Sequence, residues 1–335
     1  MTNTSNNYWH NRQALVTGAG GFIGSHLVEH LVTAGAAVRA FVRYNARADI
    51  GMLAQLPRET RSELEIVSGD LRDANAIHQA VADVDVVFHL GAIISIPYSY
   101  LHPVETVATN IMGTLNVLLA CRAHNTPRLV QTSTSEVYGS ALTVPMDESH
   151  PLQGQSPYSA SKIGADKLVE SFICSYNLPA VTVRPFNTYG PRQSARAVIP
   201  TIITQALTQE TIHLGNLDTR RDFTYVADTV GGFLLAAQKE EGLGGVFNLG
   251  VGQDITIGEL AEEIVDQIGR PVKIVSEAER LRPEKSEVMR LLSDNGRAAR
   301  QLGWQPEVTF TEGIGRTIAW IRDHLDHYQI GTYEI

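Results

Sequence analysis

The sequence predicts an α/β protein with a doubly wound parallel sheet and a smaller C-terminal α/β lobe. Three observations support this fold class. Short apolar runs alternate with helical patterns through the first half, a glycine-rich turn joins the first run to a helix, and shorter elements follow Pro191. We expect residues 1–190 to form the sheet domain and residues 191–335 to form mainly the smaller lobe, with the chain partly returning to the sheet around residues 222–250.

Composition and charge favour an ordinary globular protein. Hydrophobic residues make up 43% of the 335 residues, and the net charge of −9 argues against a nucleic-acid partner, which would need a basic face. The longest apolar run, residues 84–96, contains polar residues and is too short to span a bilayer. Residues 1–7 are too polar for a signal peptide. We therefore expect a cytoplasmic protein that binds no membrane.

The two cysteines, Cys121 and Cys174, both fall within helical patterns. We expect both to be small buried hydrophobic residues in a reducing compartment. No spacing of cysteine and histidine predicts a metal site.

A glycine-rich turn follows the first apolar strand, residues 14–16. Its glycines recur every third residue, and a second strand at residues 37–42 follows the helix. Glycines let the backbone approach a pyrophosphate at the helix N-terminus. This arrangement predicts that residues 1–190 are a Rossmann-type NAD(P)-binding domain. The residues that we assign to the cofactor from this turn are Gly18, Gly21, Phe22, Ile23 and Gly24.

The end of the second strand bears on which dinucleotide binds. A site that prefers NAD usually has an acidic residue here, to hold the ribose 2′-hydroxyl. Val42 occupies that place and Arg43 follows it. An arginine would pair with a 2′-phosphate, so we slightly favour NADP over NAD. The alternative is that Arg43 is a solvated loop residue.

Two further strand ends carry residues that would contact the cofactor. Asp70 follows the strand at residues 64–67 and would accept from the adenine amino group, cap the next helix, or do both. His89, Leu90, Gly91 and Ala92 follow the strand at residues 84–88. The small residues among them would let the cofactor lie close to the chain. We interpret His89 as a structural residue.

A hydroxyl-rich segment, residues 132–139, follows the fifth strand at residues 128–131 and contains one carboxylate, Glu136. It lies at the carboxyl end of a strand, where open α/β sheets bind ligands. Tyr158 and Lys162 follow four residues apart on one helix face. A lysine ammonium there would lower the pKa of the tyrosine from its ordinary value of about 10. The alternative is a serine-rich turn followed by a helix with a buried tyrosine.

Together these residues resemble the extended short-chain dehydrogenase/reductase family, in its nucleotide-sugar-modifying branch. The matching elements, which span essentially the whole chain, are residues 18–24, 69–71, 89–92, Tyr158 with Lys162, and 184–191. The resemblance implies that Tyr158 is the catalytic base and that Lys162 tunes it and holds the nicotinamide ribose. It implies that Thr134 bonds the tyrosine and the sugar O4. It also implies cofactor contacts from Leu71 and Leu90.

Glu136 bears on the choice of reaction within that branch. The chain reads Thr134-Ser135-Glu136, which resembles the retaining 4,6-dehydratases of the guanosine-diphosphomannose type. UDP-glucuronate decarboxylases share this triplet. Epimerases usually carry a small or uncharged residue in place of the glutamate, and inverting dehydratases carry a lysine.

Two longer stretches, residues 151–158 and 192–200, resemble the retaining UDP-N-acetylglucosamine 4,6-dehydratases of legionaminic-acid-type pathways. We therefore expect an NAD(P)-dependent lyase that acts on a UDP-sugar. A UDP-sugar 4-epimerase or a UDP-glucuronate decarboxylase is the alternative, and a non-catalytic dinucleotide-binding protein is an alternative from another class. The resemblance also implies a homodimer in which the helices at residues 103–124 and 158–176 form a four-helix bundle.

Dehydration requires an acidic C5 proton, which a ketone at C4 provides. We expect Tyr158 to take the O4 proton while the C4 hydride passes to the nicotinamide. Glu136 would then remove the C5 proton, and the C6 hydroxyl would leave with help from Ser135 or a water. The hydride would return to C6, so the cofactor is regenerated and stays bound.

Four polar residues of the second half are candidates for binding the substrate. Asn187 follows the sixth strand, and Arg196, Arg221 and Arg282 fall in later polar segments. Guanidinium groups suit a diphosphate because they bind it through two parallel hydrogen bonds. The resemblance favours Arg221 and Arg282, and Arg196 is the weaker candidate. The alternative for each is an ordinary surface arginine.

Overall fold

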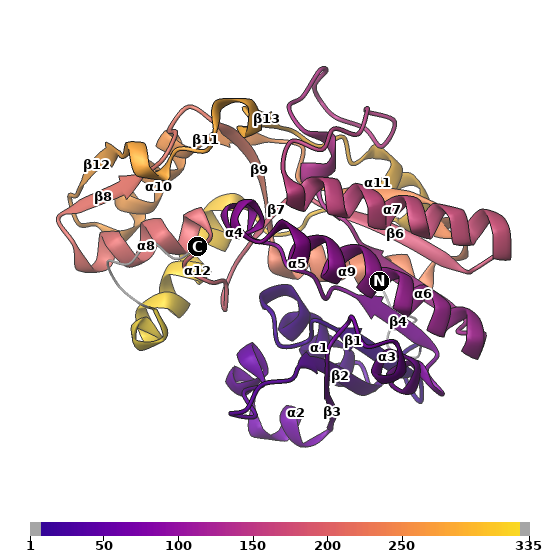
Figure 1. Cartoon of the computed structure of the whole chain (residues 1–335). Coiled ribbons are helices and arrows are strands. Elements are labelled where there is room, and N and C mark those ends of the chain that lie inside the picture. The colour runs from indigo at the N-terminus through magenta and orange to yellow at the C-terminus, as the bar shows by residue number, and fades with distance from the viewer. Residues whose placement is uncertain (1–7, 329–335) are drawn as a thin grey trace.

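The computed structural model describes residues 8–328, so the polar segment 1–7 lies outside it. A large twisted sheet with helices on both faces forms one part of the molecule, and a smaller group of strands and helices lies to one side of it (Figure 1). This arrangement confirms the predicted α/β fold.

The large sheet has seven parallel strands in the order β10-β6-β5-β4-β1-β2-β3. The strands are β1 (Gln13–Thr17), β2 (Ala37–Arg43), β3 (Leu64–Gly69), β4 (Val86–His89), β5 (Arg128–Thr132), β6 (Ala180–Pro185) and β10 (Val246–Leu249). The strand order reverses between β1 and β4. Ligands of such sheets bind in the crevice at the carboxyl ends of the strands beside this reversal.

Helices cover both faces of this sheet. They are α1 (Phe22–Thr33), α3 (Ala74–Val81), α6 (Gly113–His124), α7 (Pro157–Tyr176), α9 (Val226–Gln238) and α11 (Gly296–Leu302). Apolar strand residues alternate between two cores: Val16 and Val130 pack on the side of α1 and α9, whereas Leu15 and Leu129 pack on the side of α3, α6 and α7. Both faces are apolar because both are covered.

The helix predicted at residues 103–124 is continuous but irregular. It comprises α5 (Pro103–Val107), a π-helical turn η3 (Ala108–Met112) and α6, and it follows the short helix α4 (Ile96–Leu101). Pro103–His124, rather than residues 84–96, is the run of described residues long and apolar enough to cross a membrane by length and composition. Since 44% of its most apolar window is buried and it packs on α7, it meets this criterion as core helices of globular proteins do.

The smaller lobe is built mainly from the second half. Its strands are β7 (Asn187–Tyr189), β8 (Thr211–Leu214), β9 (Arg220–Tyr225), β11 (Asp254–Thr256), β12 (Lys273–Ser276) and β13 (Arg290–Leu291), and its helices are α8 (Val198–Thr208), α10 (Ile257–Ile268) and α12 (Phe310–Asp323). Strand β9 is central, because β7, β11 and β13 all pair with it. The chain leaves this lobe after β9 and adds α9 and β10 to the large sheet.

Short helices and 3-10 turns complete the chain. They are η2 (Gly51–Gln55), α2 (Arg58–Ser62), η4 (Ser135–Tyr138), η5 (Glu240–Gly242), η6 (Ala278–Arg280), η7 (Glu284–Ser286) and η8 (Leu325–His327). Turn η4 lies directly after β5, where the hydroxyl-rich segment was predicted.

The prediction for the cysteines is half wrong. Cys121 is buried in α6, but Cys174 is exposed on α7. The buried stripe of α7 runs through Ala165, Val169 and Phe172 at helical spacing, and Cys174 lies two residues beyond Phe172, on the solvent side of the helix.

Candidate functional site

The glycine-rich turn between β1 and α1 forms the first part of the site. Gly18 has a φ of +69°, in the left-handed region that favours glycine, and a Cβ there would lie 2.8 Å from the backbone of Gly91. A Cβ on Gly24 would lie 2.3 Å from the Gly18 carbonyl oxygen. Gly21 is the N-cap of α1 and contributes no side-chain cap, so the first N–H groups of the helix are available to an anion. These features fit the pyrophosphate of a dinucleotide.

The turn η2, which the sequence did not predict, packs onto the glycine-rich turn. The Met52 N–H donates to the Gly20 carbonyl oxygen at 2.9 Å, and a Cβ on Gly20 would lie 2.7 Å from the Ile50 carbonyl oxygen. The predicted turn residues Phe22 and Ile23 are half-buried in the first turn of α1. Gly20 is therefore needed for packing within the protein.

The segment after β4 lies beside this turn. His89 Nδ1 is 2.7 Å from Thr17 Oγ1, and His89 Nε2 is 3.1 Å from Thr114 Oγ1. Burial is the main cause that lowers the pKa of His89 to about 3, so the ring is neutral between the two threonines. These contacts agree with a structural role for His89. Leu90 and Ala92, which were assigned to the cofactor, are half-buried.

Asp70 and Leu71 follow β3. Leu71 is buried, whereas the Asp70 carboxylate is paired with Arg72 at 2.6 Å between Oδ2 and Nη2. This hydrogen bond from Arg72 is the main cause that lowers the pKa of Asp70 to about 2. The interpretation of Asp70 as a helix cap is wrong. Asp73, which directly precedes α3, is the cap and accepts from the Asn75 N–H at 2.9 Å.

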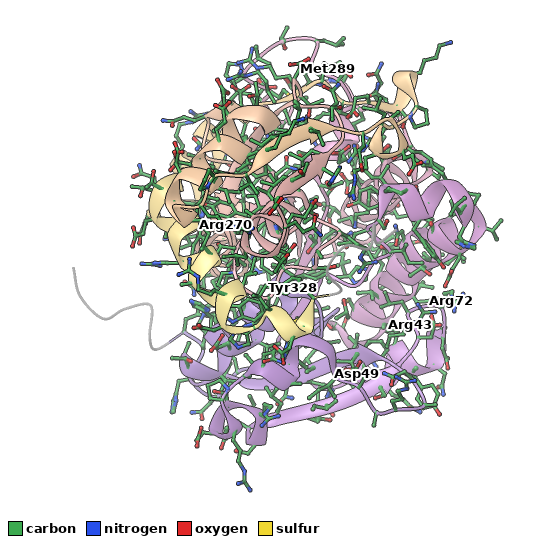
Figure 2. All side chains as sticks on the ribbon, turned by 90° about the vertical axis from the view of Figure 1, so that its left-hand side faces the viewer. Arg43, Asp49, Arg72, Arg270, Met289 and Tyr328 are labelled. Carbon is green, nitrogen blue, oxygen red and sulfur yellow. The ribbon has the colours of Figure 1, made fainter. Side chains whose placement is uncertain are left out.

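Arg43 lies at the end of β2 and is not an isolated loop residue. Its Nη2 is 3.2 Å from Glu105 Oε1 on α5, and Glu105 Oε2 accepts a 2.6 Å hydrogen bond from the Tyr98 hydroxyl. The Arg43 side chain is still 70% exposed. Arg43 and Arg72 lie on the same side of the molecule (Figure 2). The Arg43 guanidinium therefore lies at the end of β2, where the ribose is expected, and forms an ion pair with the Glu105 carboxylate.

Tyr158 and Lys162 lie on the first two turns of α7. Ser156 and Ser159 form a capping box that sets the start of this helix. The two predicted catalytic side chains are 7% and 4% exposed. Lys162 Nζ donates to the Thr132 carbonyl oxygen at 2.6 Å, which ties α7 to the end of β5.

Burial governs the ionisation of both side chains. It raises the pKa of Tyr158, an effect that the Thr134 hydrogen bond opposes and the charge of Glu136 reinforces. It lowers the pKa of Lys162 to about 8, an effect that the charge of Asp166 opposes. The prediction of a lowered tyrosine pKa is therefore wrong for the protein by itself, because the loss of hydration outweighs the neighbouring charge.

Turn η4 brings the remaining predicted catalytic residues together. The Thr134 side chain caps η4 by accepting from the Glu136 N–H at 3.2 Å, and Ser135 is buried. The charge of Glu136 raises the pKa of Tyr158 and that of Arg221 on β9. A carboxylate, a phenol and a guanidinium from three distant parts of the chain thus share one site.

Two of the predicted arginines meet at an unpredicted carboxylate. Arg221 Nη2 lies 3.5 Å and Arg282 Nη1 lies 3.9 Å from Glu287 Oε1. Burial, and then the charge of Arg282, lower the pKa of Arg221, which is 6% exposed. Arg282 Nη1 and Asn187 Oδ1 are buried without a hydrogen-bond partner. These unsatisfied groups fit a polar ligand.

The comparison with known proteins is consistent with this geometry. Residues 15–317 match the family model described as GDP-mannose 4,6 dehydratase. The chain belongs to this family.

Relatives of this GDP-mannose 4,6-dehydratase family member include both dehydratases and epimerases. A dTDP-glucose 4,6-dehydratase from Actinoplanes sp. is 33% identical over 316 residues, which cover 92% of this chain and 97% of the relative. DesIV, a dTDP-glucose 4,6-dehydratase from Streptomyces venezuelae solved with NAD bound, is 30% identical with a TM-score of 0.83, covering 95% and 99% of the two chains. A UDP-N-acetylglucosamine 4-epimerase from Methanobrevibacter ruminantium, solved with UDP-N-acetylmuramic acid, is 31% identical with a TM-score of 0.84, covering 94% and 99%.

The chain is therefore an extended short-chain dehydrogenase/reductase of the nucleotide-sugar dehydratase and epimerase group. One predicted residue of this family member lies on the surface: Arg196 is exposed, and its Nε is 3.4 Å from Ser194 Oγ. One residue of the site was missed. Glu287 follows Arg282 in the same polar loop, but nothing in the local sequence indicates that its side chain reaches two arginines.

Proposed function

We propose that the protein is an NAD(P)-dependent 4,6-dehydratase that converts UDP-N-acetylglucosamine to a UDP-4-keto-6-deoxy sugar. The observation that carries this proposal is the position of Glu136. Turn η4 holds it next to Tyr158 and Arg221, so a general base for carbon stands beside the residue that would oxidise C4. An epimerase needs the phenol but has no step that requires this carboxylate.

The residues of the chain divide the reaction between them. Tyr158, hydrogen-bonded by Thr134, takes the O4 proton, and Lys162 favours the phenolate through its charge. Glu136 removes the C5 proton once C4 is a ketone. Ser135, which is buried beside it, orients the C6 hydroxyl or a water as the hydroxyl leaves. When bound, an oxidised nicotinamide supplies the hydride acceptor and a positive charge that favours the phenolate.

The arginine pair suits the diphosphate of the substrate. Arg221 and Arg282 both lie within ion-pair distance of Glu287, and a diphosphate would compete with this carboxylate for the two guanidinium groups. Asn187, with its unsatisfied Oδ1, would receive a hydroxyl or amide donor of the substrate.

The glycine turn would hold the pyrophosphate of the cofactor, and we propose NADP rather than NAD. The support is the absence of an acid at Val42 and the guanidinium of Arg43 at the end of β2. Release of the cofactor from the purified enzyme and its mass measurement test this choice. Release of NAD alone would show that Arg43 serves only its ion pair with Glu105.

The proposal includes a cytoplasmic homodimer. Large apolar side chains are exposed on the neighbouring helices α4 to α7, with Val104 80%, Leu101 64%, Tyr176 47% and Leu119 46% exposed. Exposed large apolar side chains on adjoining helices support an interface with a second copy of the chain. Light scattering should give the mass of a dimer for the wild type and of a monomer for Val104→Lys. A wild-type monomer would contradict this part of the proposal.

Mass spectrometry of the product tests the assigned reaction. The purified enzyme is incubated with UDP-N-acetylglucosamine and, separately, with UDP-glucose, UDP-glucuronate and GDP-mannose. We expect loss of one water from UDP-N-acetylglucosamine. An unchanged mass with an inverted C4 centre would identify the second candidate, a 4-epimerase, which the related Methanobrevibacter ruminantium structure favours. Loss of carbon dioxide from UDP-glucuronate would identify a decarboxylase.

A further inference from the structure

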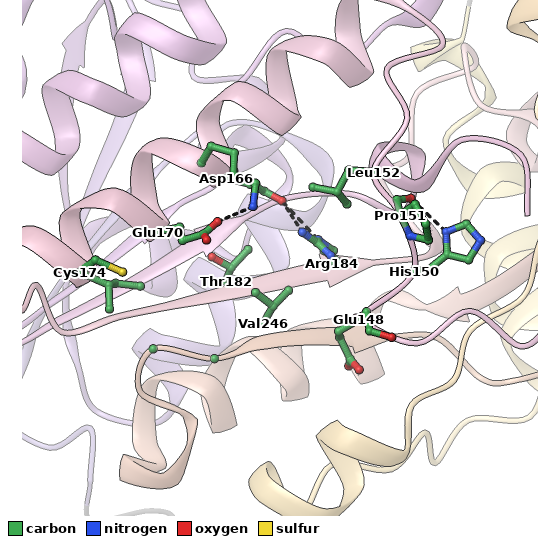
Figure 3. A pocket seen from close by; sticks show the side chains of 15 residues that line it. Glu148, His150, Pro151, Leu152, Asp166, Glu170, Cys174, Thr182, Arg184 and Val246 are labelled. Atoms are coloured by element: carbon green, nitrogen blue, oxygen red, sulfur yellow. Dashed lines mark hydrogen bonds and ion pairs between the residues drawn. The ribbon is translucent and has the colours of Figure 1, made fainter. Parts of the chain in front are cut away.

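A buried ion pair, Asp166 with Arg184, lies next to the catalytic pair on the same side of α7. Asp166 follows Tyr158 and Lys162 at steps of four residues, so the three side chains project from one side of the helix. Asp166 Oδ2 accepts from Arg184 Nε at 3.2 Å and Nη2 at 3.0 Å. Both side chains are almost fully buried. Figure 3 shows this pair between α7 and β6.

The same carboxylate oxygen also holds the end of β5. Ser133 Oγ donates to Asp166 Oδ2 at 2.8 Å. Ser133 stands between the two residues that contact the catalytic pair: the Thr132 carbonyl oxygen accepts from Lys162, and the Thr134 side chain bonds Tyr158. Through its hydrogen bond with Ser133, Asp166 therefore links α7 to the end of β5, between Thr132 and Thr134.

Stability alone explains this pair poorly. Burying two charges costs much of what their attraction returns, and apolar residues of the same size often serve stability as well. A pair kept for stability should also satisfy its hydrogen-bonding groups, yet Asp166 Oδ1 is buried without a partner. A cavity of about 470 Å³ borders the pair on the side of Glu148 and Thr182. One oxygen of the Asp166 carboxylate is therefore left without a hydrogen-bond partner.

We infer that Asp166, held by Arg184, is a positioning residue that aligns Thr132 and Thr134 with the Tyr158–Lys162 pair and supplies the negative charge behind it. This inference rests on the proposed role of Tyr158 and Lys162 in oxidising C4. It does not depend on whether dehydration, epimerisation or decarboxylation follows.

The sign of the charge effect follows from the groups around Asp166. The charged or titratable groups that face this region from α7, β4, β6 and η4 are Tyr158, Lys162, His89, Arg184, Glu136 and Tyr138. The cavity beside the pair is also lined by Glu148, His150, Lys167 and Glu170. The negative charge of Asp166 raises the pKa of Lys162 and also that of Tyr158. Oxidation at C4 needs a phenolate and an ammonium. Its rate therefore rises as Tyr158 loses its proton and falls as Lys162 loses its proton.

The variant Asp166→Asn removes this charge and keeps the shape of the side chain. Both limbs of the pH–rate profile should move to lower pH, by about one unit. The rate is the appearance of reduced cofactor after holoenzyme is mixed with the nucleotide sugar that gives the largest signal with wild type. In Asp166→Glu, both limbs should return to within a few tenths of a pH unit of their wild-type positions. Glu170→Gln, which removes an exposed carboxylate one turn further along α7, is the matched control and should leave the profile unchanged.

A second measurement needs no sugar. Affinity for the oxidised cofactor should change with pH as Lys162 loses its charge, and in Asp166→Asn this change should begin at lower pH. A failure of the proposed sugar chemistry would thus leave the inference testable. A folded Asp166→Asn protein with a lower rate but unmoved limbs in both measurements would show a merely structural residue and overturn the inference.

The variant Ser133→Ala tests the alignment even if Asp166→Asn does not fold. It removes one hydrogen bond and leaves the buried ion pair intact. We expect the rate of cofactor reduction to fall about tenfold with little change in KM, because small misplacements of reacting groups are costly. Its limbs should stay in place. A wild-type rate in Ser133→Ala would overturn the role of Asp166 in alignment.

Discussion

The two sides of the candidate site are built in different ways. On the side of the large sheet, Tyr158 and Lys162 share one helix, and hydrogen bonds to β5 and η4 hold them. On the side of the smaller lobe, Arg221 lies on a strand and Arg282 lies on a loop, and both lie near the Glu287 carboxylate. The two groups expected to oxidise C4 are thus fixed on one helix, whereas those expected to bind substrate are assembled from separate segments.

Burial has different consequences for ionisation on the two sides. It disfavours the ionised forms of Tyr158 and Lys162, which makes their charge sensitive to small changes nearby. Arg221 stays charged despite its burial, because an arginine cannot lose its proton at accessible pH. Variants of the sheet side should therefore affect the rate and its pH dependence, and variants of the lobe side should affect substrate affinity.

The largest effect should come from Tyr158→Phe. Removing the hydroxyl removes the acceptor of the O4 proton, and C4 oxidation should fall roughly 10³- to 10⁴-fold. The measurement is the amplitude and rate of cofactor reduction on mixing with substrate. The control is cofactor binding, which should persist. A normal burst of reduced cofactor would assign the proton to another group.

The variant Glu136→Gln should separate C4 oxidation from the later loss of water. C4 oxidation should continue, because Tyr158 and Lys162 are untouched, but loss of water should fall about 100-fold or more without the base for C5. Rapid-quench analysis of product, together with cofactor absorbance, separates the two steps. Dehydration at a near-wild-type rate would remove Glu136 from the mechanism and with it the main support for a dehydratase.

Arg221→Gln should act mainly on affinity. A lost charge-assisted hydrogen bond is worth about 1.5–3 kcal/mol, so KM should rise roughly 10- to 100-fold with a smaller change in kcat. Arg282→Gln should have a weaker effect, because that side chain is 29% exposed and is screened by solvent. Arg196→Gln is the control and should change KM less than about twofold. Equal effects of all three variants would contradict a diphosphate site centred on Arg221.

The smallest expected effect is at alkaline pH, where the rate of C4 oxidation and the contribution of Lys162 to stability should change in opposite directions. The pKa of Lys162 is about 8 in the folded protein and near its ordinary value in the unfolded chain. In the holoenzyme, where the nicotinamide charge favours the phenolate, oxidation at C4 should therefore decline above about pH 8. The contribution of Lys162 to stability should instead increase with pH above 8, because the unfolded chain then binds more protons. Rate profiles and denaturant unfolding check the two trends, with Lys162→Met as the variant in which both should disappear.

Much of the fold was predictable, because its signals are local. Alternating apolar runs and helices indicated the parallel sheet, and the spacing of Gly18, Gly21 and Gly24 indicated the turn after β1. The irregular parts were not predictable. The π-helical turn η3 and the packing of η2 on Gly20 depend on contacts with distant segments, which no local pattern reports.

The sequence by itself determined which catalytic groups share a face. Tyr158 and Lys162 lie one helical turn apart wherever α7 packs, and Glu136 follows four residues after the end of β5. Only the tertiary structure decided how these groups ionise and what surrounds them. Burial raised one pKa and lowered another, Glu287 joined two arginines, and Asp166 joined Ser133 to Arg184. Desolvation and charge pairing depend on neighbours in space, and those neighbours come from parts of the chain far apart in sequence.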